Sequence, residues 1–167
     1  MNITPAKENI LKKIRKALTV STPVPFPKSE GNDSVFHPSR QEPEVEFAEQ
    51  FTGLLGKFSF CINHQELASQ LNNLCAQFGW TKIFCIEDVL KEKLAAHLFN
   101  NFSYPDLAAC DASITGCECL VARTGSIVMS AAQQSGRTTS VYAPVHICIA
   151  YTSQLVYDVK DGLQMVK

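Results

Sequence analysis

The fold is decided by the stretch Ser113–Tyr151, which reads SITGCECLVARTGSIVMSAAQQSGRTTSVYAPVHICIAY. Two apolar runs in it, 119–122 and 126–129, flank a short corner at 123–125 that contains a glycine. β-Branched runs on both sides of such a corner predict a β-hairpin. The centre of this stretch is therefore expected to be two antiparallel strands joined by a tight turn.

A polar loop and a further apolar run follow the predicted hairpin. The loop covers 131–140 and carries two glutamines, a glycine and an arginine. The run 145–150 follows Pro144 and predicts a buried strand. Polar side chains are thus concentrated in turns beside buried strands, which is where functional residues on a rigid scaffold usually lie.

Upstream of this stretch, the chain alternates between strand and helix patterns. The sequence predicts strands at 57–62 and 82–86, helices at 63–78 and 88–99, and a short strand at 112–114. Strands that alternate with helices of this length indicate a mainly parallel sheet with helices on its faces. The predicted fold class is therefore α/β.

The helix predicted over 63–78 has signals at both of its ends. Asn63 followed three residues later by Glu66 is typical of a capping box, and Gly79 is typical of a helix end. A second helix pattern at 44–55 precedes it, and the final residues 159–167 predict a last helix with Val159, Leu163 and Val166 facing inward.

The N-terminal part differs from the rest in composition. Residues 4–18 predict an amphipathic helix with a basic polar face, in which Thr4 can serve as the N-cap. Five prolines in 20–43 disfavour regular helix and predict an extended arm. We therefore expect a helix and Pro-rich arm over 1–43 and an α/β domain over 44–167.

Composition narrows the classes of function. The 167 residues are 46% hydrophobic and carry a net charge of −1, which is typical of a soluble globular domain and unlike a general nucleic-acid binder. No apolar run approaches the roughly 20 residues of a membrane span, and no signal-peptide core follows the basic N-terminus. The expected location is the cytoplasm.

The cysteines agree with that location. There are seven of them, an odd number spread through apolar segments: Cys61, Cys75, Cys85, Cys110, Cys117, Cys119 and Cys148. This favours reduced thiols over a disulfide framework. Cys117, Cys119, His146 and Cys148 are soft-metal ligand types, but alternate spacing on strands is unlike the usual C-x-x-C ligand turn, so we expect no metal.

The combined pattern TG…ARTGSIV…SGR…PVHI resembles the LUD-domain family, and the resemblance extends over most of the chain. It implies a fold like that of the NagB/RpiA/CoA-transferase superfamily, whose members bind anionic substrates at strand ends. It also implies a role in lactate utilisation, with an iron–sulfur oxidoreductase set that oxidises L-lactate to pyruvate. The clusters would belong to the partner proteins, and this chain is expected to bind no cofactor.

The chain departs from the family pattern in two places. Relatives continue past the last helix with a Gly-Pro-Ser-Arg-type turn and further strands; nothing in this chain matches that segment, so the domain over 44–167 is expected to lack it. Many relatives also carry an acidic residue where this chain has Arg123. An arginine cannot act as the glutamate nucleophile of CoA transferases, so covalent acyl-CoA catalysis is disfavoured; Arg123 would bind an anion or pair with Glu118.

The candidate binding residues lie in the turns. Glycine- and hydroxyl-rich turns expose backbone N–H groups that can hold a phosphate or carboxylate, and arginine binds such groups bidentately. The candidates for an organic anion are Thr115, Gly116, Arg123, Thr124, Gly125, Ser126, Gly136 and Arg137. Simple turn formation and solvated arginines are the alternative explanation.

Two further residues are candidates for proton transfer. Glu118 can act as a general base if it is partly buried, or lie at a strand edge facing solvent. His146 can act as an acid–base, or be a buried histidine with satisfied hydrogen bonds. Neither interpretation is decided by the sequence, and whether the chain is an enzyme stays open.

Three functions are consistent with these features. The first is a subunit that assists the iron–sulfur lactate-oxidation proteins and holds a small organic anion. The second is a standalone enzyme or binding protein for a phosphorylated or CoA-linked anion. The third is a membrane-surface adaptor acting through the basic helix at 4–18. An oligomer is compatible with all three.

Overall fold

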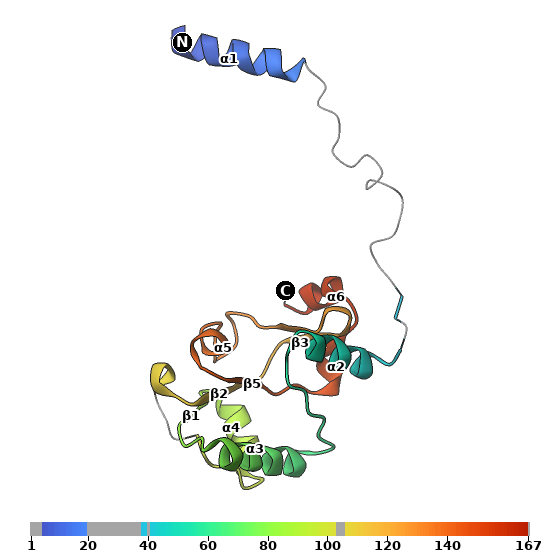
Figure 1. The fold of residues 1–167 in the computed structure, drawn as a ribbon, viewed down its shortest axis with the longest axis vertical. Helices are drawn as coiled ribbons and strands as arrows, with labels where there is room; N and C mark the ends of the chain where they lie inside the picture. Colours follow the sequence, from blue (N-terminus) through green and yellow to red (C-terminus); the bar gives the residue numbers. More distant parts are fainter. Residues whose placement is uncertain (1–4, 20–37, 40, 103–105, 167) are drawn as a thin grey trace. The chain divides into compact units, whose positions relative to one another are not determined.

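The structure is a computed structural model, and it describes residues 5–19, 38–39, 41–102 and 106–166. The chain divides into two compact units, Met1–His37 and Pro38–Lys167 (Figure 1). Thr4, the predicted N-cap, and most of the predicted arm over 20–43 lie outside the described residues.

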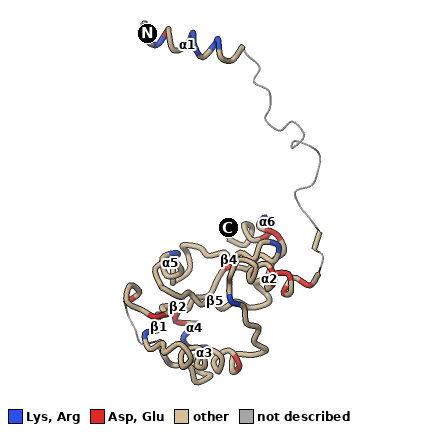
Figure 2. Tube along the Cα trace, in the orientation of Figure 1, with Lys and Arg blue, Asp and Glu red and all other residues tan. Residues whose placement is uncertain are grey.

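The first unit contains the helix α1 (Pro5–Leu18). Its apolar residues Ile10, Ile14 and Leu18 are exposed, and its lysines and arginine appear as blue segments in Figure 2. The predicted amphipathic helix is therefore present. Across the described ranges, no helix combines the length and apolar character that a bilayer crossing requires.

The second unit alternates helices and short strands. In chain order it contains α2 (Pro43–Gly53), α3 (His64–Phe78), β1 (Ile83–Phe84), α4 (Asp88–Ala95), β2 (Ala112–Thr115), β3 (Cys119–Val121), β4 (Ser126–Val128), α5 (Thr139–Tyr142), β5 (His146–Cys148), β6 (Leu155–Val156) and α6 (Val159–Met165). Single 3₁₀ turns lie at Leu107–Ala109, Ala122–Thr124 and Thr152–Gln154.

The strands form two three-stranded sheets. The first has the order β1-β2-β5 and is entirely parallel. The second has the order β4-β3-β6, in which β3 and β4 are antiparallel and β3 and β6 are parallel. The predicted parallel α/β sheet and the predicted hairpin, with Val121 opposite Ser126, are both confirmed.

The boundaries of α3 follow from its capping residues. The Asn63 side chain accepts a hydrogen bond from the Glu66 backbone N–H at 2.9 Å, as predicted. The Glu66 carboxylate in turn accepts from the N–H of Ile62, one residue before the N-cap. Gly79 ends the helix with a left-handed φ of 67°, a conformation that glycine adopts without steric cost.

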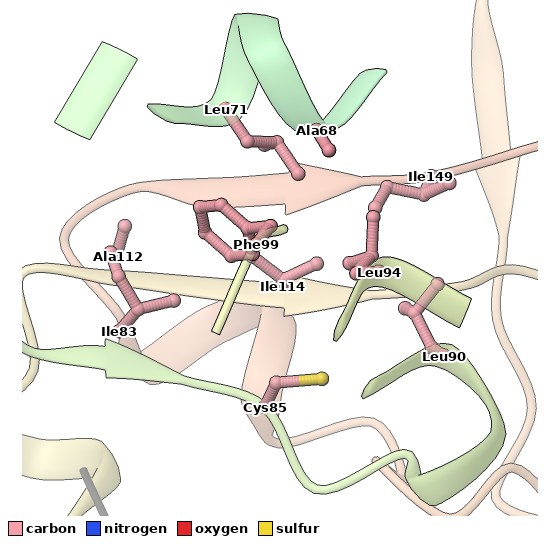
Figure 3. Packing of buried hydrophobic residues seen from close by; sticks show 10 residues of the cluster. All are labelled: Ala68, Leu71, Ile83, Cys85, Leu90, Leu94, Phe99, Ala112, Ile114 and Ile149. Carbon is pink, nitrogen blue, oxygen red and sulfur yellow. The ribbon is translucent and has the colours of Figure 1, made fainter. Parts of the chain in front are cut away.

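The main core lies between α3, α4 and one face of the parallel sheet (Figure 3). Side chains from these elements point toward one another, and Leu94, Phe99 and Ala112 are completely buried. The cluster comprises Ala68, Leu71, Ile83, Cys85, Leu90, Leu94, Phe99, Ala112, Ile114 and Ile149. This burial of apolar surface is what holds the two helices against the sheet.

The second sheet packs against α2 and α6 through close backbone approaches. Gly125, at the corner of the hairpin, has φ 61°, and a Cβ atom there would lie 2.6 Å from the backbone nitrogen of Phe51 in α2. A Cβ atom on Gly162 of α6 would lie 3.1 Å from the Cys119 Sγ. The glycine in the corner is therefore required by both its conformation and its contact with α2.

Three details of the sequence interpretation are wrong. The predicted strand 57–62 has no regular secondary structure, because alternation alone supplies no neighbouring strand to pair with. The helix predicted over 44–55 ends at Gly53, and Leu55 lies in the turn after it and is 90% exposed. In α6, Gly162 is buried, whereas Val159, Leu163 and Val166 are exposed to solvent to a large extent.

Candidate functional site

The face of the parallel sheet opposite the core is polar. Ser113 on β2 is paired with His146 on β5, and Thr115 is paired with Cys148. Paired residues of neighbouring strands share one face, so these four side chains lie on the same side of the sheet. Ser113 and Thr115 are completely buried, and the Ser113 hydroxyl donates to the Thr139 carbonyl of α5 at 3.1 Å.

Glu87 connects two loops at the end of this face. It lies three residues beyond the end of β1, and α4 begins at the next residue. One carboxylate oxygen accepts a hydrogen bond from the Gly116 backbone N–H at 2.9 Å, and the other accepts from the Ser135 hydroxyl at 2.5 Å. Glu87 therefore joins the turn after β2 to the polar loop that precedes α5.

Sequence reasoning missed Glu87, although a signal was present. Ligands of open parallel sheets bind beyond the carboxyl ends of the strands, so a carboxylate placed directly after a predicted strand is a candidate. The strand predicted at 82–86 ends immediately before Glu87. Its position after the predicted strand does not show which loops it contacts, because that depends on the order of the strands in the sheet.

The His146 ring contacts the Thr115 side chain. The His146 Nε2 lies 2.8 Å from the Thr115 Oγ1, which itself donates to the Gly116 carbonyl at 2.8 Å. Because the hydroxyl proton is used in that bond, His146 Nε2 carries the proton that is donated to Thr115. Burial lowers the pKa of His146, and the negative charge of Glu87 opposes that change. The imidazole is thus held neutral in one tautomer.

Two thiols lie near Thr115 and His146. Cys117, two residues beyond Thr115, is buried, and Cys148 is half-buried with its Sγ 3.8 Å from the Gly116 carbonyl oxygen. The Cys148 thiol donates to the Gly116 carbonyl, and its interaction with the neighbouring Cys117 lowers the pKa of Cys117 and raises the pKa of Cys148. We call Glu87, Thr115, Gly116, Cys117, Ser135, His146 and Cys148 the strand-end cluster.

The strand-end cluster combines a carboxylate, an imidazole, hydroxyls and thiols at the carboxyl ends of β1, β2 and β5. Such a group can hold a small polar ligand by hydrogen bonds and move a proton to or from it. Within the described part of the chain, no three His, Cys, Asp or Glu residues are placed to hold a metal ion together. Cys119, one of the four soft-ligand residues, packs instead against Gly162 of α6.

Arg123 lies in a different environment, at the corner of the hairpin. Its Nε and one terminal nitrogen donate to the two carboxylate oxygens of Asp158 at 3.0 and 3.2 Å. The guanidinium lowers the pKa of Asp158, whose side chain also caps α6 by accepting from the Lys160 N–H. The suggested pairing with Glu118 is wrong, since Glu118 accepts from the Ser130 hydroxyl at 2.5 Å and is half-buried.

The other predicted turn residues of the hairpin make local contacts. The Thr124 hydroxyl donates to the Ser126 hydroxyl at 2.9 Å, and the Gly125 N–H donates to the Ala122 carbonyl at 3.3 Å. These groups belong to the second sheet and pack beside α2. Anion binding by this corner stays a prediction, and its arginine is already paired with a carboxylate.

Gly136 and Arg137 lie in the loop that reaches the strand-end cluster. Gly136 is half-buried with φ 59°, and the preceding Ser135 hydroxyl contacts Glu87. Arg137 is exposed, and among the residues that the structure describes its guanidinium makes no hydrogen bond or ion pair. The structure therefore brings Thr115, Gly116, Gly136 and His146 to one region and places Arg123 to Ser126 in another.

Comparison with known proteins places this cluster in a family. Residues 86–167 match the family model of the LUD domain. This part of the chain is a LUD domain. The family prediction is confirmed, and every residue of the strand-end cluster lies inside the LUD domain.

Two curated relatives are similar over part of the chain. The Lactate utilization protein C of Deinococcus radiodurans is 34% identical over 65 residues, which cover 38% of this chain. An uncharacterised protein of Neisseria meningitidis serogroup B is 32% identical over 54 residues, or 32% of this chain. The matched regions span 31% and 23% of the lengths of these two relatives.

A solved structure supports the fold. The crystal structure of a DUF162 family protein from Deinococcus radiodurans superposes with a TM-score of 0.63 at 20% identity. The superposition covers 78% of this chain and 81% of that chain. The α/β fold predicted from the sequence is therefore shared with a solved protein.

Proposed function

We propose that this chain acts in lactate utilisation as a subunit that binds a small organic acid and assists an iron–sulfur oxidoreductase system that oxidises L-lactate to pyruvate. The observation that carries this proposal is the LUD domain at 86–167, together with the similarity to a relative named Lactate utilization protein C. The redox chemistry is assigned to partner proteins in the cytoplasm, and this chain supplies binding and proton transfer.

The strand-end cluster supports the binding of a hydroxy or keto acid. The hydroxyls of Thr115 and Ser135 and the imidazole of His146 are of the types that hydrogen-bond a ligand hydroxyl or carbonyl. A ligand carboxylate requires a cation, because Glu87 repels it. Arg137, two residues from Ser135, supplies the guanidinium that the described residues leave unpaired.

The experiment is lactate oxidation to pyruvate by the purified iron–sulfur partners, with and without this chain. We expect oxidation to need the chain and to fall at least tenfold with Arg137→Ala, with partial recovery in Arg137→Lys. Arg123→Ala is the matched control, because it removes an arginine that is paired with Asp158 outside the cluster. Co-purification of the partners with each variant shows whether assembly is intact.

The opposite result is equally informative. If the chain neither changes lactate oxidation nor co-purifies with those proteins, the lactate proposal is wrong. A thermal-melting series with lactate, pyruvate, phosphosugars and CoA esters then distinguishes the standalone alternative, since a ligand stabilises the fold by RT ln(1 + [L]/Kd). Stabilisation by a phosphorylated or CoA-linked compound alone would favour that alternative.

A further inference from the structure

Cys148 lies beside the turn that carries Cys117. Cys148 is paired with Thr115 in the parallel register, and Cys117 lies two residues beyond Thr115, in the turn after the end of β2. The Cys148 Sγ lies 3.8 Å from the carbonyl oxygen of Gly116, the residue between Thr115 and Cys117. The Cys148 thiol therefore contacts the turn that carries Cys117, and the two thiols are neighbours.

We propose that Cys117 and Cys148 form a dithiol site that reacts with small disulfide compounds and closes to an intramolecular disulfide beside Glu87 and His146. This proposal does not rest on the function in lactate utilisation, because it concerns only the reactivity of two side chains. The co-reactant is a low-molecular-weight disulfide of the glutathione class.

The chemistry follows from the closeness of the two thiols at the Gly116 turn. The neighbouring Cys148 thiol lowers the pKa of Cys117 and makes it the better thiolate. The Cys117 thiolate attacks one sulfur of the small disulfide and releases the other as a thiolate, which leaves a mixed disulfide on Cys117. Loss of the proton from Cys148 then allows its sulfur to attack Cys117, which releases the second small thiolate.

The electrons and protons of these two steps balance. The two cysteines lose two electrons and two protons, and the small disulfide is reduced to two thiols. The half-buried position of Cys148 places one sulfur of the pair at the edge of the site, where the small disulfide approaches. The new bond joins the turn at Gly116 to β5, so oxidation alters the turn that Glu87 contacts.

The other buried cysteines are placed differently. Burial in the core raises the pKa of Cys85 to about 11, and its side chain packs among apolar residues. Cys119 is completely buried, its Sγ lies near Gly162, and burial raises its pKa as well. Cys119 is therefore a matched control, only two residues from Cys117 but facing α6.

The test treats the reduced, purified full chain with oxidised glutathione, blocks the remaining thiols and digests with trypsin. Cleavage leaves Cys110, Cys117 and Cys119 in the peptide 94–123 and Cys148 in the peptide 138–160, so the cysteine variants identify which thiol of the first peptide is linked. We expect a disulfide between these two peptides in the wild type and in Cys119→Ala. We expect its loss in both Cys117→Ala and Cys148→Ala, and its reversal by dithiothreitol.

Three outcomes would overturn the proposal. The first is a link that persists in Cys117→Ala or Cys148→Ala, and the second is a link that disappears in Cys119→Ala. The third is a wild type that carries only mixed glutathione disulfides. Circular dichroism of each variant before treatment confirms that the compared samples are folded, and either of the two site variants is sufficient to decide the assignment.

Discussion

The two faces of the parallel sheet β1-β2-β5 are made from the same strands but from opposite kinds of residue. On one face, Ala112, Ile114 and Ile149 pack against α3 and α4. On the other, Ser113 and Thr115 are equally inaccessible but form hydrogen bonds. Parallel sheets covered on both faces are usually apolar on both. A buried polar face departs from that rule, and such departures are typical of functional sites.

The largest expected effect is on the apolar face. Ile114→Ala removes a side chain that is 1% exposed in the middle of the core and leaves a cavity. We expect a loss of about 2–5 kcal/mol in the free energy of unfolding. Urea unfolding measures it, with Leu163→Ala of α6, which is 62% exposed, as the control that should change stability by less than about 0.5 kcal/mol.

Substitutions on the polar face should change the free energy of unfolding in a different way, because the side chains there are held by hydrogen bonds and not by apolar packing. Glu87→Ala leaves the Gly116 N–H and the Ser135 hydroxyl without their acceptor. We expect a stability loss of about 1–3 kcal/mol, since hydrogen bonds to charged groups are worth that much. Glu87→Gln retains an acceptor oxygen and should lose less.

Comparing Glu87→Ala with Glu87→Gln separates the contribution of the hydrogen bonds of Glu87 to stability from the effect of its negative charge. Ligand titration by calorimetry, at a temperature where both Glu87 variants are folded, measures how much the charge of Glu87 affects ligand binding. If Glu87→Ala is as stable as the wild type, the carboxylate does not connect the two loops in solution, and the distinction between the two faces is weakened.

The sequence predicted the elements that local signals define. Asn63 and Gly79 set the ends of α3, and the corner at Gly125 set the hairpin, because caps and left-handed turns depend on a few adjacent residues. The strand 57–62 was wrong because pairing is a long-range property that alternation does not report. The inward face of α6 was wrong for a similar reason, since the close approach of Gly162 to Cys119 decides its orientation.

The site was predicted in part. Thr115, Gly116 and His146 were candidates from their turns and strand, and the register of β2 with β5 brings them together. Arg123 attracted attention as an anion binder, but its partner Asp158 is 35 residues away and begins another helix. Glu87 was not found, because only the sheet order shows that the end of β1 lies beside the turn after β2.

The smallest expected effect is a pH dependence of the polar face. Burial lowers the pKa of His146, so the folded chain keeps this imidazole neutral at a pH where the unfolded chain binds a proton. Stability from this residue is therefore complete above the ordinary histidine pKa of about 6.5 and decreases as the pH falls toward the lowered value. Glu87 favours the charged imidazole and opposes the effect of burial, which keeps the pH dependence small.

His146→Gln tests this, because the glutamine amide can still donate to Thr115 but does not titrate. Urea unfolding of both proteins at pH 8, 6.5 and 5 should give similar stabilities at pH 8 and a steeper acid loss in the wild type. Parallel curves would mean that His146 is not buried in the neutral state. A steeper loss in the variant would reverse the sign and place a charged imidazole, paired with Glu87, on the polar face.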